Sequence, residues 1–280
     1  MLARGQWNDG GDLKRTEAWR LNAERIVLFG WTRAILLQLA HPLIAAAVSQ
    51  HGSFRRGRLQ PVLRLRHTVR AMQSLTFGSE ARRTETIKRI NALHRTINGT
   101  LDEEIGPFRR GTRYSAEDPA LLLWVHATLV ESVPLAYERF VGPMTDAERD
   151  RYCDEAAWMV EALGGTDRPI PRTAAAVRQY IDEMYASGHI VVSATARELA
   201  RGVLQPPFAW TAWPATRVNW LFAVGLLPAH LQAQYGFTWT TRDEQALRRW
   251  TRVLSALRRL IPDALATWRQ SRSHQSMPSA

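Results

Sequence analysis

Two adjacent stretches decide the fold: VLRLRHTVRAMQSLTF (residues 62–77) and TETIKRINALHRTIN (residues 84–98). Gly78 and Ser79 separate them from one another. Both stretches repeat apolar residues at intervals of three and four, which predicts two consecutive amphipathic helices. The fold built around them is therefore expected to be helical.

The chemistry-bearing residues of these two helices lie at helical spacing. Arg64, His67 and Thr68 stand at i, i+3 and i+4, so they share one face of the first helix. His94 lies in an apolar stripe of the second helix. One imidazole that binds iron, facing an arginine that neutralises a propionate, is an arrangement that could hold haem. The competing interpretation of His94 is a hydrogen-bonded histidine of the core.

Four segments, in this order along the chain, carry a resemblance to a known family. They are LLQLAHPLIAAAVSQHGSF (36–54), RLRHTVRAMQSLTFG (64–78), LHRTINGT (93–100) and YSAEDPALLLWVHATLVESVPLAYERFVGPMT (114–145). The chain resembles the MpaB-type oxygenases and the latex-clearing rubber oxygenases from about residue 31 to 165, and more loosely beyond. The resemblance implies an all-α fold with a globin-like core and additional C-terminal helices.

The same resemblance implies a haem b-dependent oxygenase. It carries the proximal iron ligand onto His94 and the distal arginine and threonine onto Arg64 and Thr68. His67 falls where a rubber oxygenase has a lysine, and an imidazole there is a candidate second axial ligand. The family often has an arginine where this chain has Asn98, so that part of the pocket departs from the pattern. His126 is the next candidate for the haem pocket, with a core histidine bonded to a backbone carbonyl as the alternative.

The implied reaction uses dioxygen on an apolar small molecule or isoprenoid, in a pocket lined by apolar side chains. Glu131 and His51 are candidates for a catalytic base. Two other functions stay open: a non-catalytic haem protein for redox or gas sensing, and a haem-free helical protein that binds a lipid or a partner. The apolar residues proposed for the pocket are equally those of any helical core: Leu36, Leu39, Ile44, Val48, Leu75, Leu122 and Leu129.

Motifs of competing chemistries are absent from the sequence. It has no GxSxG elbow for a nucleophilic hydrolase and no glycine loop with lysine for phosphate. It has no HExxH for zinc, and none of Glu103, Glu104, Glu131 and Glu138 has a histidine three residues on, as a di-iron bundle requires. The absence of these Glu-x-x-His pairs favours porphyrin iron over a carboxylate-bridged iron pair.

Composition bounds the class of protein. The chain has 280 residues, of which 45% are hydrophobic, enough for one large core. Its net charge of +11 comes almost wholly from arginine and is spread over every segment. Without a DNA- or RNA-binding motif, this charge predicts no nucleic-acid partner. The single cysteine, Cys153, indicates a reducing compartment and a buried thiol.

We expect a cytoplasmic protein with no signal peptide and no transmembrane segment. The most apolar run, residues 34–48, is too short to cross a membrane, and it contains His41 and Pro42. Peripheral contact with a membrane stays open. Pro42 predicts a kink at His41.

The expected organisation is a flexible arm (1–13), a helical domain (14–268) with a sub-boundary near 165–172, and a disordered tail (269–280). Gly30 is expected to separate two helices. Capping boxes are expected where Thr145 precedes Glu148 and where Thr241 precedes Glu244. Further helices are expected at 119–141, 145–164, 173–186, 193–204, 214–235 and 241–260. Residues 101–118 are expected to form an irregular connection, and the one weak strand signal is HIVVS (189–193).

Overall fold

The structure is a computed structural model of the chain, and it describes residues 16–52, 60–205 and 213–272. The predicted N-terminal arm, residues 53–59 and residues 273–280 of the predicted disordered tail lie outside the described residues. The start of that tail, Arg269–Arg272, is a short helix. The described part is helical apart from one short two-stranded sheet, which confirms the all-α prediction. The globin-like arrangement of the core stays a prediction.

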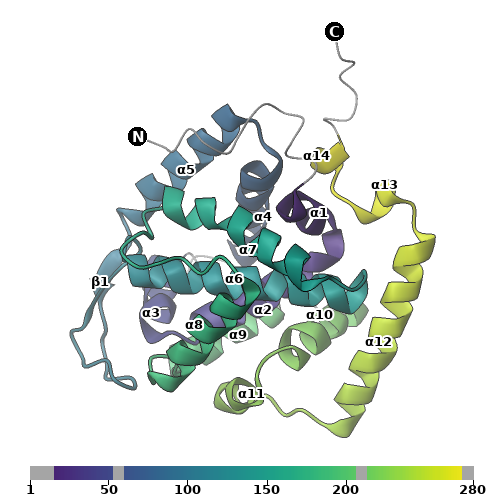
Figure 1. Ribbon diagram of the computed structural model, residues 1–280. Helices are drawn as coiled ribbons and strands as arrows, with labels where there is room; N and C mark the ends of the chain where they lie inside the picture. Colours follow the sequence, from purple (N-terminus) through teal and green to yellow (C-terminus); the bar gives the residue numbers. More distant parts are fainter. Residues whose placement is uncertain (1–15, 53–59, 206–212, 273–280) are drawn as a thin grey trace.

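Helices follow one another from the first described residues onward (Figure 1). The first half contains α1 (Glu17–Ala23), the 3-10 turn η2 (Arg25–Val27), α2 (Leu28–Leu39), α3 (Pro42–His51), α4 (Gln60–Phe77), α5 (Glu80–His94) and α6 (Pro119–Phe140). The second half contains α7 (Asp146–Ala162), α8 (Ala174–Ala186), α9 (Ala194–Leu204), α10 (Trp213–Gly225), α11 (Ala229–Tyr235), α12 (Thr241–Leu260), α13 (Asp263–Ala266) and α14 (Arg269–Arg272).

The apolar segments α2 and α6 form the centre of the molecule (Figure 1). They pack along each other, and α8, α9 and α10 cover them from the C-terminal half. The main hydrophobic core runs from Leu21 to Tyr235 and includes residues on both sides of 165–172. Ile190 and Val192 of the predicted weak strand are buried in this core, but they form no strand.

The break between α2 and α3 lies where the sequence predicts it. Pro42 is the first residue of α3, and His41 caps that helix because its Nδ1 accepts from the backbone N–H of Leu43. The two helices meet at an angle of 102°. The prediction of a buried, kinked helix in this apolar run is confirmed.

Two helix boundaries differ from the prediction. Gly30 lies inside α2 and does not separate two helices. It allows α2 and α6 to pack closely, because a Cβ at this position would stand 2.5 Å from the carbonyl oxygen of Ser132 in α6. The chain bends earlier, at Glu24. The predicted helix 214–235 is divided at Pro228, which has no N–H to continue α10 and becomes the N-cap of α11.

A small hairpin replaces the irregular connection expected after α5. Strand β1 (Asn98–Thr100) pairs in antiparallel fashion with β2 (Arg113–Ser115), and Gly99 lies opposite Tyr114. Tyr114 is buried, and its hydroxyl donates to the side chain of Gln50 on α3 at 2.5 Å. The hairpin is therefore held by a contact with α3 that no local sequence pattern predicts.

Among the described helices, α6 is long and apolar enough to cross a membrane by length and composition alone. In its most apolar window, 72% of the residues are buried inside the protein. Such burial is the pattern of a core helix, and the contact of α6 with α2, α7, α8 and α12 is consistent with it.

Candidate functional site

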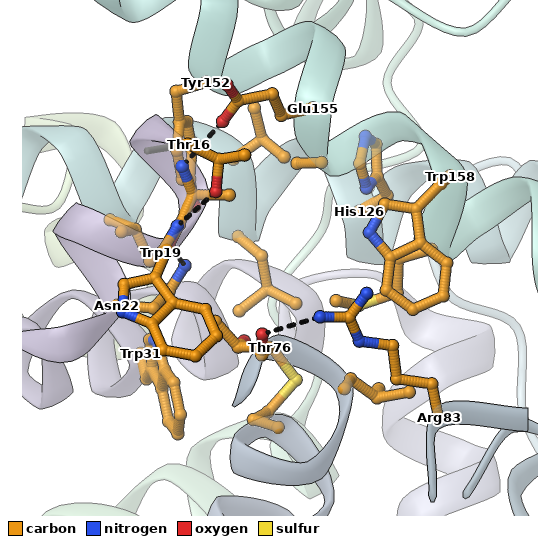
Figure 2. Close-up of a pocket in the computed structure, with 18 residues that line it drawn as sticks. Thr16, Trp19, Asn22, Trp31, Thr76, Arg83, His126, Tyr152, Glu155 and Trp158 are labelled. Carbon is orange, nitrogen blue, oxygen red and sulfur yellow. Dashed lines mark hydrogen bonds between the residues drawn. The ribbon is translucent and has the colours of Figure 1, made fainter. Parts of the chain in front are cut away.

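A cavity lies where α1, α2, α4, α5, α6 and α7 converge (Figure 2). Its volume is about 60 Å³, room for roughly two water molecules at their liquid volume of about 30 Å³ each. The apolar part of its wall is made by Trp31, Met72, Leu75, Leu129, Val130, Val133, Ala156 and Met159, and the polar part by Thr16, Asn22, Thr76, Arg83, His126, Tyr152 and Glu155. A largely apolar pocket with a few polar groups is the usual form of a small-molecule site.

His126 is one of the most deeply buried polar residues in this wall. It comes from the middle of α6 and is only 6% exposed. Burial, together with the positive charge of Arg172, lowers its pKa to about 4. The imidazole is therefore neutral at pH 7. Its Nε2 has no hydrogen-bond partner in the described part of the chain, so the carbonyl bond considered for a core histidine is not made by this atom.

Two charged side chains and an indole complete the polar lining. Arg83 donates from Nη2 to the carbonyl of Thr76, 3.2 Å away, and burial lowers the pKa of its guanidinium. Glu155 accepts from the backbone N–H of Ala18 at 2.8 Å, and burial raises the pKa of its carboxyl group. The Nε1 of Trp31 is buried without a partner among the described residues. Figure 2 shows these groups around the cavity.

His94, the predicted iron ligand, is the last residue of α5 and is partly buried. Burial lowers the pKa of its imidazole, and the carboxylate of Glu117 acts in the opposite direction. Its Nδ1 is buried and has no partner within the described residues. His94 does not belong to the lining of the cavity around His126.

The three predicted residues of α4 lie near its N-terminal end. His67 and Thr68 are exposed, and the side chain of Arg64 lies outside the described part. His67 and Thr68 do not line the cavity, to which α4 contributes Met72, Leu75 and Thr76 further along. α4 and α5 pack against each other, so both helices that carry the predicted site are neighbours.

The remaining predicted polar residues have partners elsewhere. Asn98 is exposed at the start of β1, and its Nδ2 donates to the carbonyl of Arg95 at 3.3 Å. His51, a candidate base, lies 2.9 Å through Nε2 from the carbonyl oxygen of Asn98. Glu131, the other candidate base, accepts from Arg33 at 2.6 Å.

Of the apolar residues proposed for a substrate pocket, Leu75 and Leu129 line the cavity. Leu36, Leu39 and Leu122 are buried but lie outside its lining. Among the cavity residues that sequence reasoning missed, the largest group from one helix comes from α7. Tyr152, Ala156 and Met159 stand at i, i+4 and i+7 there, and this inward stripe was the available signal.

The donors present suit haem better than a metal ion held by protein alone. In the part of the chain that the structure describes, no three His, Cys, Asp or Glu side chains come together to hold a metal. A haem iron needs one or two axial ligands from the protein, and neutral imidazoles with an unpartnered nitrogen satisfy this requirement at His94 and His126. The cavity itself is smaller than the roughly 300 Å³ or more of typical ligand pockets, so a porphyrin needs more room than the described side chains leave there.

Comparisons with known proteins agree with the resemblance in the sequence. The family model described as the catalytic domain of "ER-bound oxygenase mpaB/B'/Rubber oxygenase" matches residues 19–256. The uncharacterized proteins Mb2261 of Mycobacterium bovis and Rv2237 of Mycobacterium tuberculosis are each 27% identical to the chain over 209 residues, which are 72% of this chain and 76% of theirs. No solved structure matches the chain.

Proposed function

The chain belongs to the family of the ER-bound oxygenase mpaB/B' and the rubber oxygenases, and from this membership we propose that it is a haem b-dependent oxygenase acting on an apolar substrate of isoprenoid type. The family supports an oxygenase catalytic domain and hence an oxidoreductase. Haem and the class of substrate are the proposal. The observation that carries it is His94, whose partly buried imidazole has an unpartnered nitrogen in the segment LHRTINGT.

In this proposal His94 holds the haem iron. A histidine binds iron only as the neutral imidazole, and burial favours that form by lowering the pKa of His94. Its place at the end of α5 is fixed by the helix and by the packing of α5 on α4. The ligand is therefore presented in the correct protonation state without a second residue to deprotonate it.

The proposed roles on α4 follow the resemblance. Arg64 would hold the haem by neutralising a propionate, Thr68 would offer a hydroxyl group to dioxygen, and His67 would be a candidate second ligand of the iron. The haem, when bound, supplies the activation of dioxygen. The protein binds and orients the substrate and excludes water. His126, neutral and buried, can accept a hydrogen bond in the small cavity that it lines.

The first experiment is an absorption spectrum of the purified protein, with haem content measured by the pyridine haemochrome assay. We expect a Soret band that is lost in His94→Ala and kept in His126→Ala. His126→Ala is the matched control. It removes from the neighbouring cavity another imidazole, whose Nε2 has no hydrogen-bond partner among the described residues. A colourless protein that stays colourless after expression with added haem precursor contradicts the proposal, as does a Soret band indifferent to His94→Ala.

The second experiment distinguishes an enzyme from the other two functions left open by the sequence. Dioxygen uptake is measured with a prenylated substrate and with a saturated analogue of the same length. An oxygenase consumes dioxygen with the alkene only. A haem protein for sensing shows the Soret band without uptake, and a haem-free lipid-binding protein shows neither.

A further inference from the structure

Helix α12 carries an apolar row on its exposed face. Trp250, Val253, Leu257 and Leu260 stand at i, i+3, i+7 and i+10, and they are 37%, 40%, 44% and 80% exposed. Beyond the end of the helix, Ile261 and Leu265 continue the exposed apolar surface. We call these six residues the α12 row. Apart from Leu93, every large apolar side chain that is exposed in the described part of the chain belongs to it.

The row is exposed although α12 is firmly attached to the rest of the molecule. Its other face buries Leu247 and packs Leu254 against the cluster that includes Phe140 and Phe222. Near its C-terminal end, Arg258 donates to Glu24 from Nε at 2.8 Å and from Nη2 at 2.6 Å. Figure 1 shows α12 along the outer edge of the molecule, in contact with α6 and α10 on one side only. The apolar row is therefore a surface feature of a fixed helix.

Arginines occupy the arc of α12 next to the row. Arg248, Arg249, Arg252 and Arg259 are exposed, and no acidic residue occurs between Glu244 and Asp263. Arg248 pairs with Glu244 at 2.9 Å. Arg249, Arg252 and Arg259 form no ion pair with the residues that the structure describes. An apolar row with tryptophan thus lies beside a band of uncompensated positive charge.

We propose that α12 docks on an anionic lipid surface, with the α12 row in the headgroup region and the arginines on lipid phosphates. A helix with an apolar stripe and a basic face lies in the plane of a membrane interface, and tryptophan favours that depth. The positive charge favours an anionic lipid surface over a second copy of the chain as the partner of α12. A symmetric dimer through α12 brings two bands of arginine together, in a protein of net charge +11. The inference is independent of haem and of the proposed reaction.

The experiment is flotation of the full-length protein with vesicles of phosphatidylcholine alone and of phosphatidylcholine mixed with phosphatidylglycerol. We expect binding to the mixed vesicles that weakens as salt is raised. Arg249→Gln/Arg252→Gln is expected to lower the partition coefficient about thirtyfold. Each basic residue near an anionic surface contributes about 1 kcal/mol to the binding free energy, and the loss of two such contributions converts to this factor. Leu257→Ser/Leu260→Ser is expected to weaken binding at every salt concentration.

A matched control removes two exposed arginines elsewhere. Arg178→Gln/Arg201→Gln, on α8 and α9, changes the net charge equally and leaves α12 intact. Binding of this control within about twofold of the parent supports a local site, because nonspecific attraction follows the total charge. Circular dichroism checks that each variant is folded. Absence of binding to the mixed vesicles, or equal losses in the α12 variant and the control, overturns the proposal. So does a dimer in sedimentation that Leu257→Arg dissociates while vesicle binding is unchanged.

Discussion

Arg33 of α2 and Glu131 of α6 form an ion pair inside the central helix interface, with 2.6 Å between Nη1 and Oε2. The side chain of Arg33 is 4% exposed and that of Glu131 is 26% exposed. Arg33 also donates to Ser132 Oγ and to the carbonyl of Leu226 at the end of α10, each at 2.6 Å. One buried guanidinium thus joins three segments, and a glutamate expected from the sequence as a base is held in a structural contact.

Arg33→Met is expected to lower the free energy of unfolding by about 2 to 4 kcal/mol, because it leaves a partly buried carboxylate, a hydroxyl and a carbonyl without their donor. The measurement is urea denaturation followed by circular dichroism. Arg89→Met is the control, since Arg89 pairs with Glu85 at 2.8 Å on the exposed face of α5, where an ion pair contributes about 0 to 1 kcal/mol. Equal losses in the two variants contradict the structural role of Arg33.

Gly30→Ala tests the close approach of α2 and α6. The added methyl group meets the carbonyl oxygen of Ser132 at 2.5 Å and the side chain of Ala136 at 3.0 Å. Overpacking of this kind costs about 1 to 3 kcal/mol, against a gain of about 1 kcal/mol from the higher helix propensity of alanine. We expect a lower melting temperature. Gly142→Ala, where a Cβ meets nothing within 4 Å, should leave the melting temperature nearly unchanged.

The helices were largely predictable from the sequence because their signals are local. The helix expected from residue 119 begins at Pro119, and the capping box of Thr145 with Glu148 is found where the sequence places it. Gly30 misled because a glycine that ends a helix and a glycine that admits a neighbouring helix look alike in one sequence. Pro228 was the local signal for the division between α10 and α11, and the prediction passed over it.

Helix α12 begins at Thr241 as predicted, but its capping box is formed by other residues than Thr241 and Glu244. Thr240, not Thr241, is the N-cap: its Oγ1 accepts from the backbone N–H of Asp243, and the Asp243 carboxylate accepts from the backbone N–H of Thr240 at 3.0 Å. Thr240→Ala is therefore expected to cost about 1 kcal/mol. Thr241→Ala, in the first turn, should cost less than half of that. A larger loss of stability for Thr241→Ala than for Thr240→Ala, in thermal or urea unfolding, would support Thr241 as the N-cap.

The candidate site was less predictable than the helices, for a physical reason. His94 and His126 were both named from the sequence, His94 from its apolar stripe and the family resemblance, and His126 from the resemblance. The cavity around His126 is a tertiary feature of six elements, and its walls include Arg83 and Glu155, which carry no local signal. Spacing shows that residues share a helix face, but it does not tell which other helix that face meets.

Cys153 is expected to be inert in the native protein. The thiol is 2% exposed, and burial raises its pKa to about 12, with the charge of Asp150 acting in the same direction. Because the thiolate is the reactive form, modification by a thiol reagent at pH 8 should wait for unfolding. Labelling followed by mass spectrometry, with and without urea, measures this. Complete labelling within minutes in the absence of urea contradicts the burial of Cys153.

Acid should destabilise the protein through its buried histidines, and His126 allows the effect to be isolated. Burial lowers the pKa values of His126 and His41 to about 4, from the ordinary 6.5. The folded state thus favours the neutral rings, and this stability is complete above about pH 6.5 and is lost as the pH falls towards 4. Each histidine should account for about 1 to 2 kcal/mol of unfolding free energy between pH 7 and pH 5.

His126→Leu removes one of the two groups, so its urea-unfolding free energy should fall less over this interval than that of the parent protein. Carboxylates that titrate in the same range remain in both proteins and cancel in the difference. An equal fall in both would mean that the His126 ring is not held neutral by its surroundings.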